Sequence, residues 1–174
     1  NPEAMLSDPE LKIQNILYNS SKTERITINS DSLLYESLKY TSFTYVKPIL
    51  KNIVECLTKE YNIKNFNRIG LRYVNLIKMP IKNKKEIFDW TGYINSTLLF
   101  DSNFIEEKNM LQEIRIIDFK LDESYDLLCR LQVGIPNRNM PADLMEKIYL
   151  IDIDGYSNSL VEQEDAIDVL TKIH

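Results

Sequence analysis

The chain has little of the chemistry on which most enzymes depend. Its 174 residues include one histidine, His174, and two cysteines, Cys56 and Cys129. Ser-His-Asp triads, Cys-His pairs and histidine-based zinc sites each need an imidazole or a thiolate in a defined position. The sequence therefore disfavours most hydrolase mechanisms, and we expect a binding function without a cofactor rather than an enzyme.

Glycine is also scarce, with 4 residues in the whole chain. Neither a Gly-x-Gly-x-x-Gly fingerprint nor a Walker-type loop occurs in it. Both motifs need several glycines so that the backbone can approach a phosphate closely. The sequence therefore excludes a nucleotide site built on a glycine-rich loop.

The chain lacks both a long apolar run and an excess of positive charge. No apolar run approaches the roughly 18 to 20 residues that span a bilayer, so we expect no membrane partner. The formal net charge of −5 disfavours nucleic acid as a partner. Cys56 and Cys129 lie far apart and have no metal-ligand spacing, which is typical of reduced thiols and favours a cytoplasmic location.

The apolar pattern predicts a single α+β domain over residues 1–174. Segments in which apolar and polar residues alternate are separated by turn residues, which indicates antiparallel strands. We expect a twisted antiparallel β-sheet with one long helix packed on one face and a C-terminal helix. The expected strands span residues 16–18, 26–28, 33–40, 68–80, 113–121, 125–135 and 148–154.

Two segments have helical periodicity instead. Apolar residues recur every three or four positions over residues 43–61, which predicts a helix of about five turns whose apolar stripe packs on the sheet. A second stripe predicts the C-terminal helix and consists of Ala166, Val169, Leu170 and Ile173.

The strand that follows the long helix carries two arginines, Arg68 and Arg72, with Gly70 between them. Side chains in a strand alternate between the two faces of a sheet, so both arginines lie on one face. Asp152 and Asp154 share a face of another expected strand. One interpretation is therefore a set of cross-strand ion pairs on a half-solvated sheet face.

A second interpretation of the same face is a site for a small anionic ligand. Arg68 and Arg72 would hold a phosphate or a carboxylate with paired guanidinium donors, and Gly70 would let the ligand approach the backbone. Arg130, which alternates with the apolar residues of its own strand, would be a third donor. Both interpretations stay open.

Asp152 and Asp154 support an alternative function as an enzyme. Two carboxylates on one strand face could hold a divalent metal in a phosphoester-processing enzyme. A calcium loop of the EF-hand kind needs a bidentate acidic ligand at its twelfth position, and counting from Asp152 that position is Gln163. An EF-hand loop is therefore excluded.

The arginine face is not uniformly polar. Several large apolar residues share its parity, so we expect part of this face to be covered. The candidates for the cover are residues 91–109, the C-terminal helix or a second copy of the chain in a homodimer. The apolar residues concerned are Val74, Leu76, Leu128, Ile148 and Leu150.

Residues 66–75 form the most distinctive motif, Phe66-x-Arg-Ile-Gly-Leu-Arg-Tyr-Val-Asn75. Together with the preceding helix, the Tyr149-x-x-Asp-x-Asp strand and the closing Leu170-x-x-Ile-His segment, it resembles a sporadically distributed family of bacterial and archaeal proteins of unknown function. The resemblance covers most of the chain and implies no catalytic residues. It also implies that the chain is part of a longer native protein.

Overall fold

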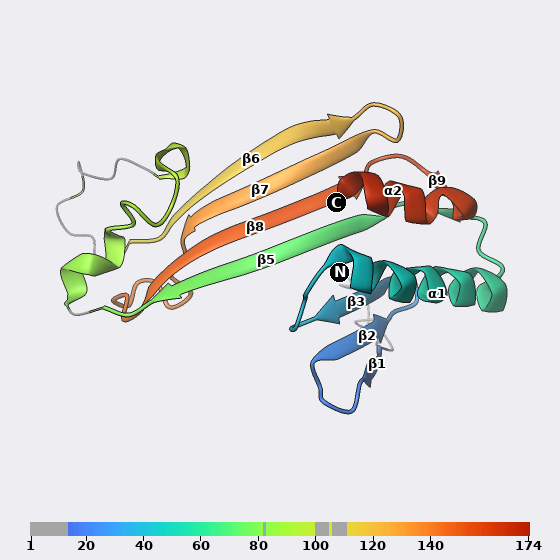
Figure 1. Ribbon diagram of the computed structural model, residues 1–174, viewed down its shortest axis with the longest axis horizontal. Coiled ribbons are helices and arrows are strands. Elements are labelled where there is room, and N and C mark those ends of the chain that lie inside the picture. The colour runs from blue at the N-terminus through green and yellow to red at the C-terminus, as the bar shows by residue number, and fades with distance from the viewer. Residues whose placement is uncertain (1–13, 82, 100–104, 106–110) are drawn as a thin grey trace, which may run out of the picture. The chain divides into compact units, whose positions relative to one another are not determined.

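The computed structural model describes residues 14–81, 83–99, 105 and 111–174. These residues form an α+β protein with antiparallel strands, as the sequence predicts (Figure 1). The strands form three sheets rather than the single sheet that was expected. By internal contacts the chain divides into two compact units, with the boundary between Cys56 and Leu57. None of the helices in the described ranges is long and apolar enough to cross a membrane.

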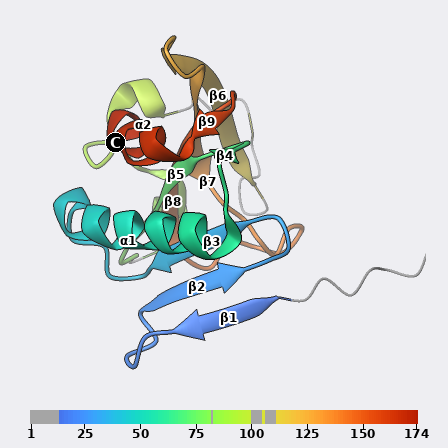
Figure 2. The same cartoon turned by 90° about the vertical axis from the view of Figure 1, so that its right-hand side faces the viewer.

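The first unit contains a three-stranded antiparallel sheet in the order β1-β2-β3 (Figure 2). Its strands are β1 at Asn15–Tyr18, β2 at Glu24–Ile28 and β3 at Leu33–Ser37. Asn19 closes the first turn, because its side-chain oxygen accepts hydrogen bonds from the backbone N–H groups of Thr23 and Glu24. β3 ends at Ser37, before the predicted end at residue 40.

Helix α1, Phe43–Tyr61, has the bounds that the sequence predicts. Ser42 caps its start, because the Ser42 hydroxyl accepts a hydrogen bond from the backbone N–H of Tyr45. The first two residues of the apolar stripe, Phe43 and Val46, are buried. α1 crosses the boundary between the two units, and its predicted packing on the larger sheet stays a prediction.

The second unit is built on a four-stranded antiparallel sheet in the order β5-β8-β7-β6 (Figure 1). The strands are β5 at Gly70–Met79, β8 at Lys147–Ser157, β7 at Leu127–Ile135 and β6 at Glu113–Asp122. The predicted strand 125–135 begins only at Leu127, because Asp126 has a φ of 47° and belongs to the turn. A short pair of strands, β4 at Asn65–Phe66 and β9 at Val161–Glu162, completes the strands of this unit.

One face of the four-stranded sheet is apolar and is covered at one end by helix α2, Ala166–Ile173 (Figures 1 and 2). A short 3₁₀ turn, η3 at Gln163–Asp165, leads into this helix. Gly155 on β8 makes the close approach of α2 feasible, since a Cβ at this position would overlap Cγ2 of Ile173. Cys129 on β7 lies on the same face and is buried, and this burial raises the pKa of its thiol.

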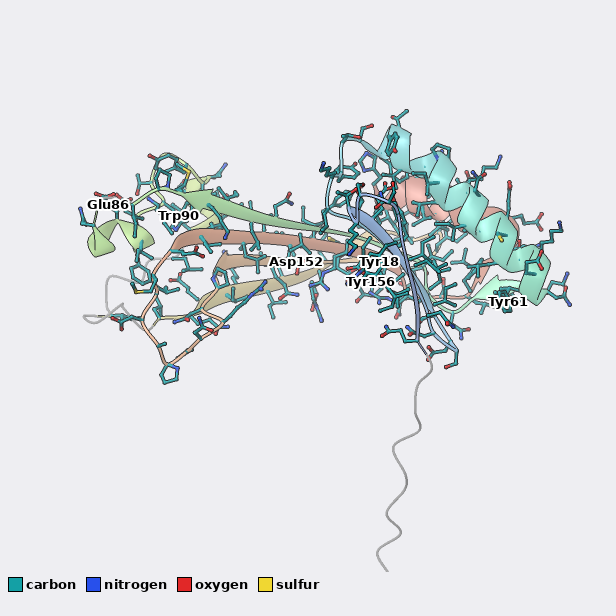
Figure 3. All side chains as sticks on the ribbon, turned by 90° about the horizontal axis from the view of Figure 1, so that it is seen from below. Tyr18, Tyr61, Glu86, Trp90, Asp152 and Tyr156 are labelled. Atoms are coloured by element: carbon teal, nitrogen blue, oxygen red, sulfur yellow. The ribbon has the colours of Figure 1, made fainter. Side chains whose placement is uncertain are left out.

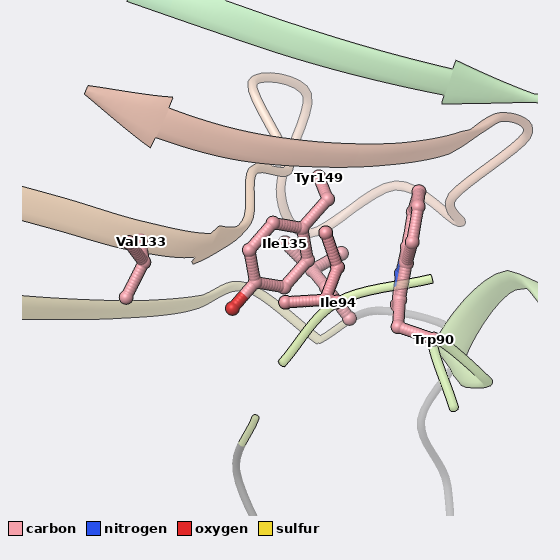
Figure 4. Packing of buried hydrophobic residues seen from close by; sticks show 5 residues of the cluster. All are labelled: Trp90, Ile94, Val133, Ile135 and Tyr149. Atoms are coloured by element: carbon pink, nitrogen blue, oxygen red, sulfur yellow. The ribbon is translucent and has the colours of Figure 1, made fainter. Parts of the chain in front are cut away.

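The other end of the apolar face is covered by the connection between β5 and β6, which includes the 3₁₀ helices η1 at Lys84–Phe88 and η2 at Ser96–Leu98. The Tyr149 hydroxyl donates a hydrogen bond to the Leu98 carbonyl over 2.5 Å. The Lys147 amine donates to the Asp89 carbonyl and lies 5.0 Å from the ring centroid of Trp90. The buried cluster at this end consists of Trp90, Ile94, Val133, Ile135 and Tyr149 (Figure 4).

The contact between Gly155 and α2 leads to a first prediction. Gly155→Ala should lower the free energy of unfolding by about 1 to 3 kcal/mol, because the added methyl group displaces Ile173 from the sheet. Urea unfolding followed by the fluorescence of Trp90, the only tryptophan, measures this change. In an Ile173→Ala background the same substitution should cost less, and strictly additive losses would show that the two residues do not interact.

Candidate functional site

The face of the four-stranded sheet opposite α2 carries the charged residues that the sequence singles out. Directly paired residues of neighbouring antiparallel strands point to the same face, so the register places them in rows across the sheet. The first row, which we call the charged row, has alternating signs of charge. It consists of Arg72 on β5, Asp154 on β8, Arg130 on β7 and Asp118 on β6.

Two further rows follow as β5 runs away from Arg72. The mixed row consists of Val74, Asp152, Gln132 and Ile116, in the same strand order. The apolar row consists of Leu76, Leu150, Gly134 and Ile114. We call these three rows, together with Arg68 and Tyr156 at the neighbouring end of the sheet, the charged face.

The strongest interaction on the charged face joins Arg72 to Asp152. The Arg72 Nε lies 2.8 Å from Oδ1 of Asp152 and its Nη2 lies 2.5 Å from Oδ2, which is a bidentate arrangement. The Asp152 side chain is 5% exposed, whereas that of Arg72 is 55% exposed, so the guanidinium shields the carboxylate from solvent. These hydrogen bonds raise the pKa of the Arg72 guanidinium.

Arg68 binds the next aspartate along β8. Its Nη2 lies 3.1 Å from Oδ2 of Asp154, and its guanidinium carbon lies 4.3 Å from the ring centroid of Tyr156. Asp152 and Tyr156 both belong to β8 and are labelled in Figure 3. The Tyr156 ring therefore supports the Arg68 side chain while Asp154 neutralises its charge.

Arg130 and Asp118 form the third pair, directly across β7 and β6. Nε and Nη2 of Arg130 lie 2.8 Å and 3.1 Å from the two carboxylate oxygens of Asp118. Both side chains are about half exposed, at 47% and 57%. The hydrogen bonds from Arg130 lower the pKa of the Asp118 carboxyl, and the same bonds raise the pKa of the Arg130 guanidinium.

The cross-strand ion pairs predicted from the sequence are thus confirmed. The structure places Gly70, Arg72 and Arg130 on one face of one sheet. β5 begins at Gly70 rather than at the predicted residue 68, and Arg68, just before the strand, reaches the same face by binding Asp154. Each of the three guanidiniums is bound by a carboxylate. Gly70 is closely approached by β8, since a Cβ there would lie 3.2 Å from the Gly155 carbonyl oxygen. The anion site assigned to these four residues stays a prediction.

Asp152 and Asp154 lie in adjacent rows of the charged face, as their parity predicts. Each carboxylate accepts hydrogen bonds from an arginine. Within the described residues, no group of three or more His, Cys, Asp and Glu side chains is arranged to hold a metal ion. A metal held by these two aspartates would therefore need a further ligand from elsewhere.

The role of Tyr156 was not predicted from the sequence, because the predicted strand ended at residue 154. β8 continues to Ser157, and Tyr156 has the same parity as Asp152 and Asp154. From this shared parity, the place of Tyr156 on the charged face could have been predicted. Gln132 and Ile116 also belong to the charged face through pairing across β8, β7 and β6, which strand parity alone does not reveal.

Apolar side chains on the charged face are exposed to solvent. Val74 is 54% exposed, Leu76 is 41% exposed and Ile116 is 56% exposed. Val74 and Ile116 lie in the mixed row, next to the charged row, and Leu76 lies in the apolar row. Val74 and Leu76 adjoin each other along β5, and exposed apolar side chains that adjoin one another mark a surface for interaction.

Comparison with known proteins finds no matching family model, no matching curated sequence and no matching solved structure. The family resemblance of residues 66–75 accordingly stays a prediction. The function must be inferred from the charged face itself.

The different burial of the ion pairs leads to a second prediction. Asp152→Asn should lower the free energy of unfolding by about 1 to 3 kcal/mol, because it removes a bidentate charged hydrogen bond from a shielded position. Asp118→Asn should have a smaller effect, because solvent screens the Arg130 pair. Urea unfolding of both variants measures the difference, and equal losses would contradict the assigned burial.

The lowered pKa of Asp118 leads to a third prediction, on pH. A carboxyl whose pKa is lower in the folded state stabilises the fold above its unfolded pKa of about 3.9, and this contribution is lost as the pH falls through the folded pKa. Stability measured by urea unfolding should therefore fall as the pH drops below about 4. Asp118→Asn and Arg130→Gln should reduce this pH dependence alike, and an unchanged profile in either variant would remove the pair as its source.

Proposed function

We propose that this protein is a non-enzymatic interaction module that binds a protein partner through the charged face. The observation that carries the proposal is the placement of three Arg–Asp pairs beside exposed Val74, Leu76 and Ile116 on one sheet face. Protein interfaces combine apolar contact area with arginine, which binds partners through both its charge and its flat guanidinium.

The engagement of the arginines favours a protein partner over a small anion. Arg72 and Arg130 each make two hydrogen bonds to a carboxylate of the same chain. A small anionic ligand would have to displace these carboxylates, or share the guanidiniums with them. A protein surface need not displace the carboxylates, because it can contact the exposed edges of the ion pairs and the exposed apolar side chains together.

The same pairs argue against the metal-dependent enzyme considered from the sequence. Asp152 and Asp154 are the carboxylates that such an enzyme would use, and both are bound by arginines. Positive guanidiniums next to a metal ligand oppose the binding of a divalent cation. The arrangement therefore supports a recognition surface rather than phosphoester chemistry.

Two expectations from the sequence remain part of this proposal. The first is that the long helix α1 packs on the sheet face opposite the charged face. The second is a cytoplasmic location, which agrees with Cys56 and Cys129 being free thiols.

A photocrosslinking experiment in cells tests the proposal. Full-length protein would carry p-benzoylphenylalanine in place of Val74 or Ile116, two exposed residues of the charged face. Met145, which is 67% exposed and lies outside the sheet, is the matched control position. Irradiation should give a discrete protein adduct from Val74 and Ile116 and none from Met145.

The mass of the adduct identifies the class of partner. An adduct of twice the mass of the chain would indicate a second copy, whereas any other discrete mass would indicate a different protein. No adduct from either face position, or equal adducts from Met145, would contradict the proposed function.

A further inference from the structure

The arginines at the β5 side of the charged face are more exposed than the aspartates that they bind. The Arg68 side chain is 57% exposed, whereas that of Asp154 is 24% exposed. The same order holds for Arg72, which shields Asp152 from solvent. A partner that approaches this part of the face therefore meets guanidinium groups before it meets carboxylates.

Both arginines have donors that can bind a second carboxylate. A guanidinium carries five N–H groups in one plane. Arg72 donates to Asp152 through Nε and Nη2, and Arg68 donates to Asp154 through Nη2. Within the described part of the chain, these bonds leave the Nη1 of each arginine for another acceptor. A carboxylate of a partner can therefore bind the outer edges of both guanidiniums while Asp152 and Asp154 stay in place.

The two other cations of this sheet face are balanced by acids of similar exposure. Lys120 lies in the row on the other side of the charged row, and its amine lies 3.6 Å from Oδ1 of Asp126, with both side chains about half exposed. Arg130 and Asp118 are also about equally exposed. The excess of exposed positive charge therefore lies at Arg68 and Arg72. The row of Lys120 consists of Gly70, Tyr156, Leu128 and Lys120.

Exposed apolar side chains adjoin the two arginines. Val74 pairs directly with Asp152, so it lies beside the carboxylate that Arg72 binds. Leu76 follows on the same face of β5. A partner that covers this area needs acidic groups for the arginines and an apolar group for Val74 and Leu76.

The spacing of the two arginine sites suits an extended segment. Asp152 and Asp154, which hold the guanidiniums, are two residues apart on β8, and that separation is about 7 Å. Alternate residues of an extended polypeptide have the same spacing. Two carboxylates on alternate residues of one segment can therefore reach Arg72 and Arg68 together.

We propose that the partner of the charged face is an acidic segment of a protein, whose carboxylates bind the outer edges of Arg68 and Arg72 while an adjoining apolar side chain covers Val74 and Leu76. This inference rests on the proposed function, because it names the chemistry of the partner at the same surface. The apolar contact distinguishes such a segment from a simple anion, which can use the arginines alone.

Binding of polymers of defined composition to the full-length chain tests this inference. The probe is a fluorescein-labelled random copolymer of glutamate and tyrosine, titrated with the chain up to about 500 μM and followed by fluorescence anisotropy. Labelled polyglutamate and a labelled thymidine oligonucleotide of similar length are the controls. The copolymer should bind at least about fivefold more tightly than either control, because it alone combines carboxylates with an apolar side chain.

Variants of the positive part test the role of charge. Arg68→Gln should weaken binding of the copolymer by about threefold or more, because one exposed guanidinium is lost. Arg138→Gln removes the same charge from an exposed residue outside the sheet and should have no effect. Arg72 is left unchanged, since its loss would expose Asp152 without a partner.

A second pair of variants tests the apolar contact. Val74→Ser should reduce binding of the copolymer towards the level of polyglutamate and leave binding of polyglutamate unchanged. Met145→Ser, at an exposed position outside the sheet, is the matched control and should change neither. Because all four substituted residues are exposed, each variant should fold, and thermal unfolding followed by Trp90 fluorescence checks that it does.

The outcomes separate the two proposals. A preference for the copolymer that is reduced by Arg68→Gln and Val74→Ser, and by neither control variant, supports the inference. No binding up to about 500 μM, an oligonucleotide that binds as tightly as the copolymer, or binding that neither Arg68→Gln nor Val74→Ser weakens would overturn it. If photocrosslinking from Val74 then still gives a discrete protein adduct, the charged face binds a protein of different chemistry, and only the acidic segment is rejected.

Discussion

The antiparallel register of β5, β8, β7 and β6 determines both faces of the larger unit. Paired residues share a face, so the register that buries Leu127 and Val133 on one side also aligns Arg130 with Asp154 and Asp118 on the other. A slip of one residue on any strand would bring charges into the core. Because exposed ion pairs contribute little, burial of the apolar face holds the register and the charged row follows from it.

Features that depend on local periodicity were the ones best predicted from the sequence. The helix at 43–61 and the apolar face of β7 follow from spacing along the chain alone, and both were predicted. The order of strands in the sheet is different, because β5 pairs with β8 across a long stretch of sequence. Parity shows which residues of one strand share a face, but it does not show which strand lies alongside.

The ion pairs illustrate the same limit at the level of single side chains. Backbone pairing sets Arg72 directly opposite Asp154, yet its guanidinium binds Asp152, one row further along. Arg68 binds Asp154 instead, and its guanidinium lies over the ring of Tyr156. An arginine is long enough to reach the diagonal neighbour, so the pairing depends on how two arginines share two carboxylates, and strand patterns do not contain that information.

The charges of the charged face are neutralised in pairs within the chain. Its three arginines and three aspartates cancel, so long-range attraction or repulsion from this face is weak, although the chain as a whole has a net charge of −5. Specific recognition of a partner by this face must then come from contacts at short range.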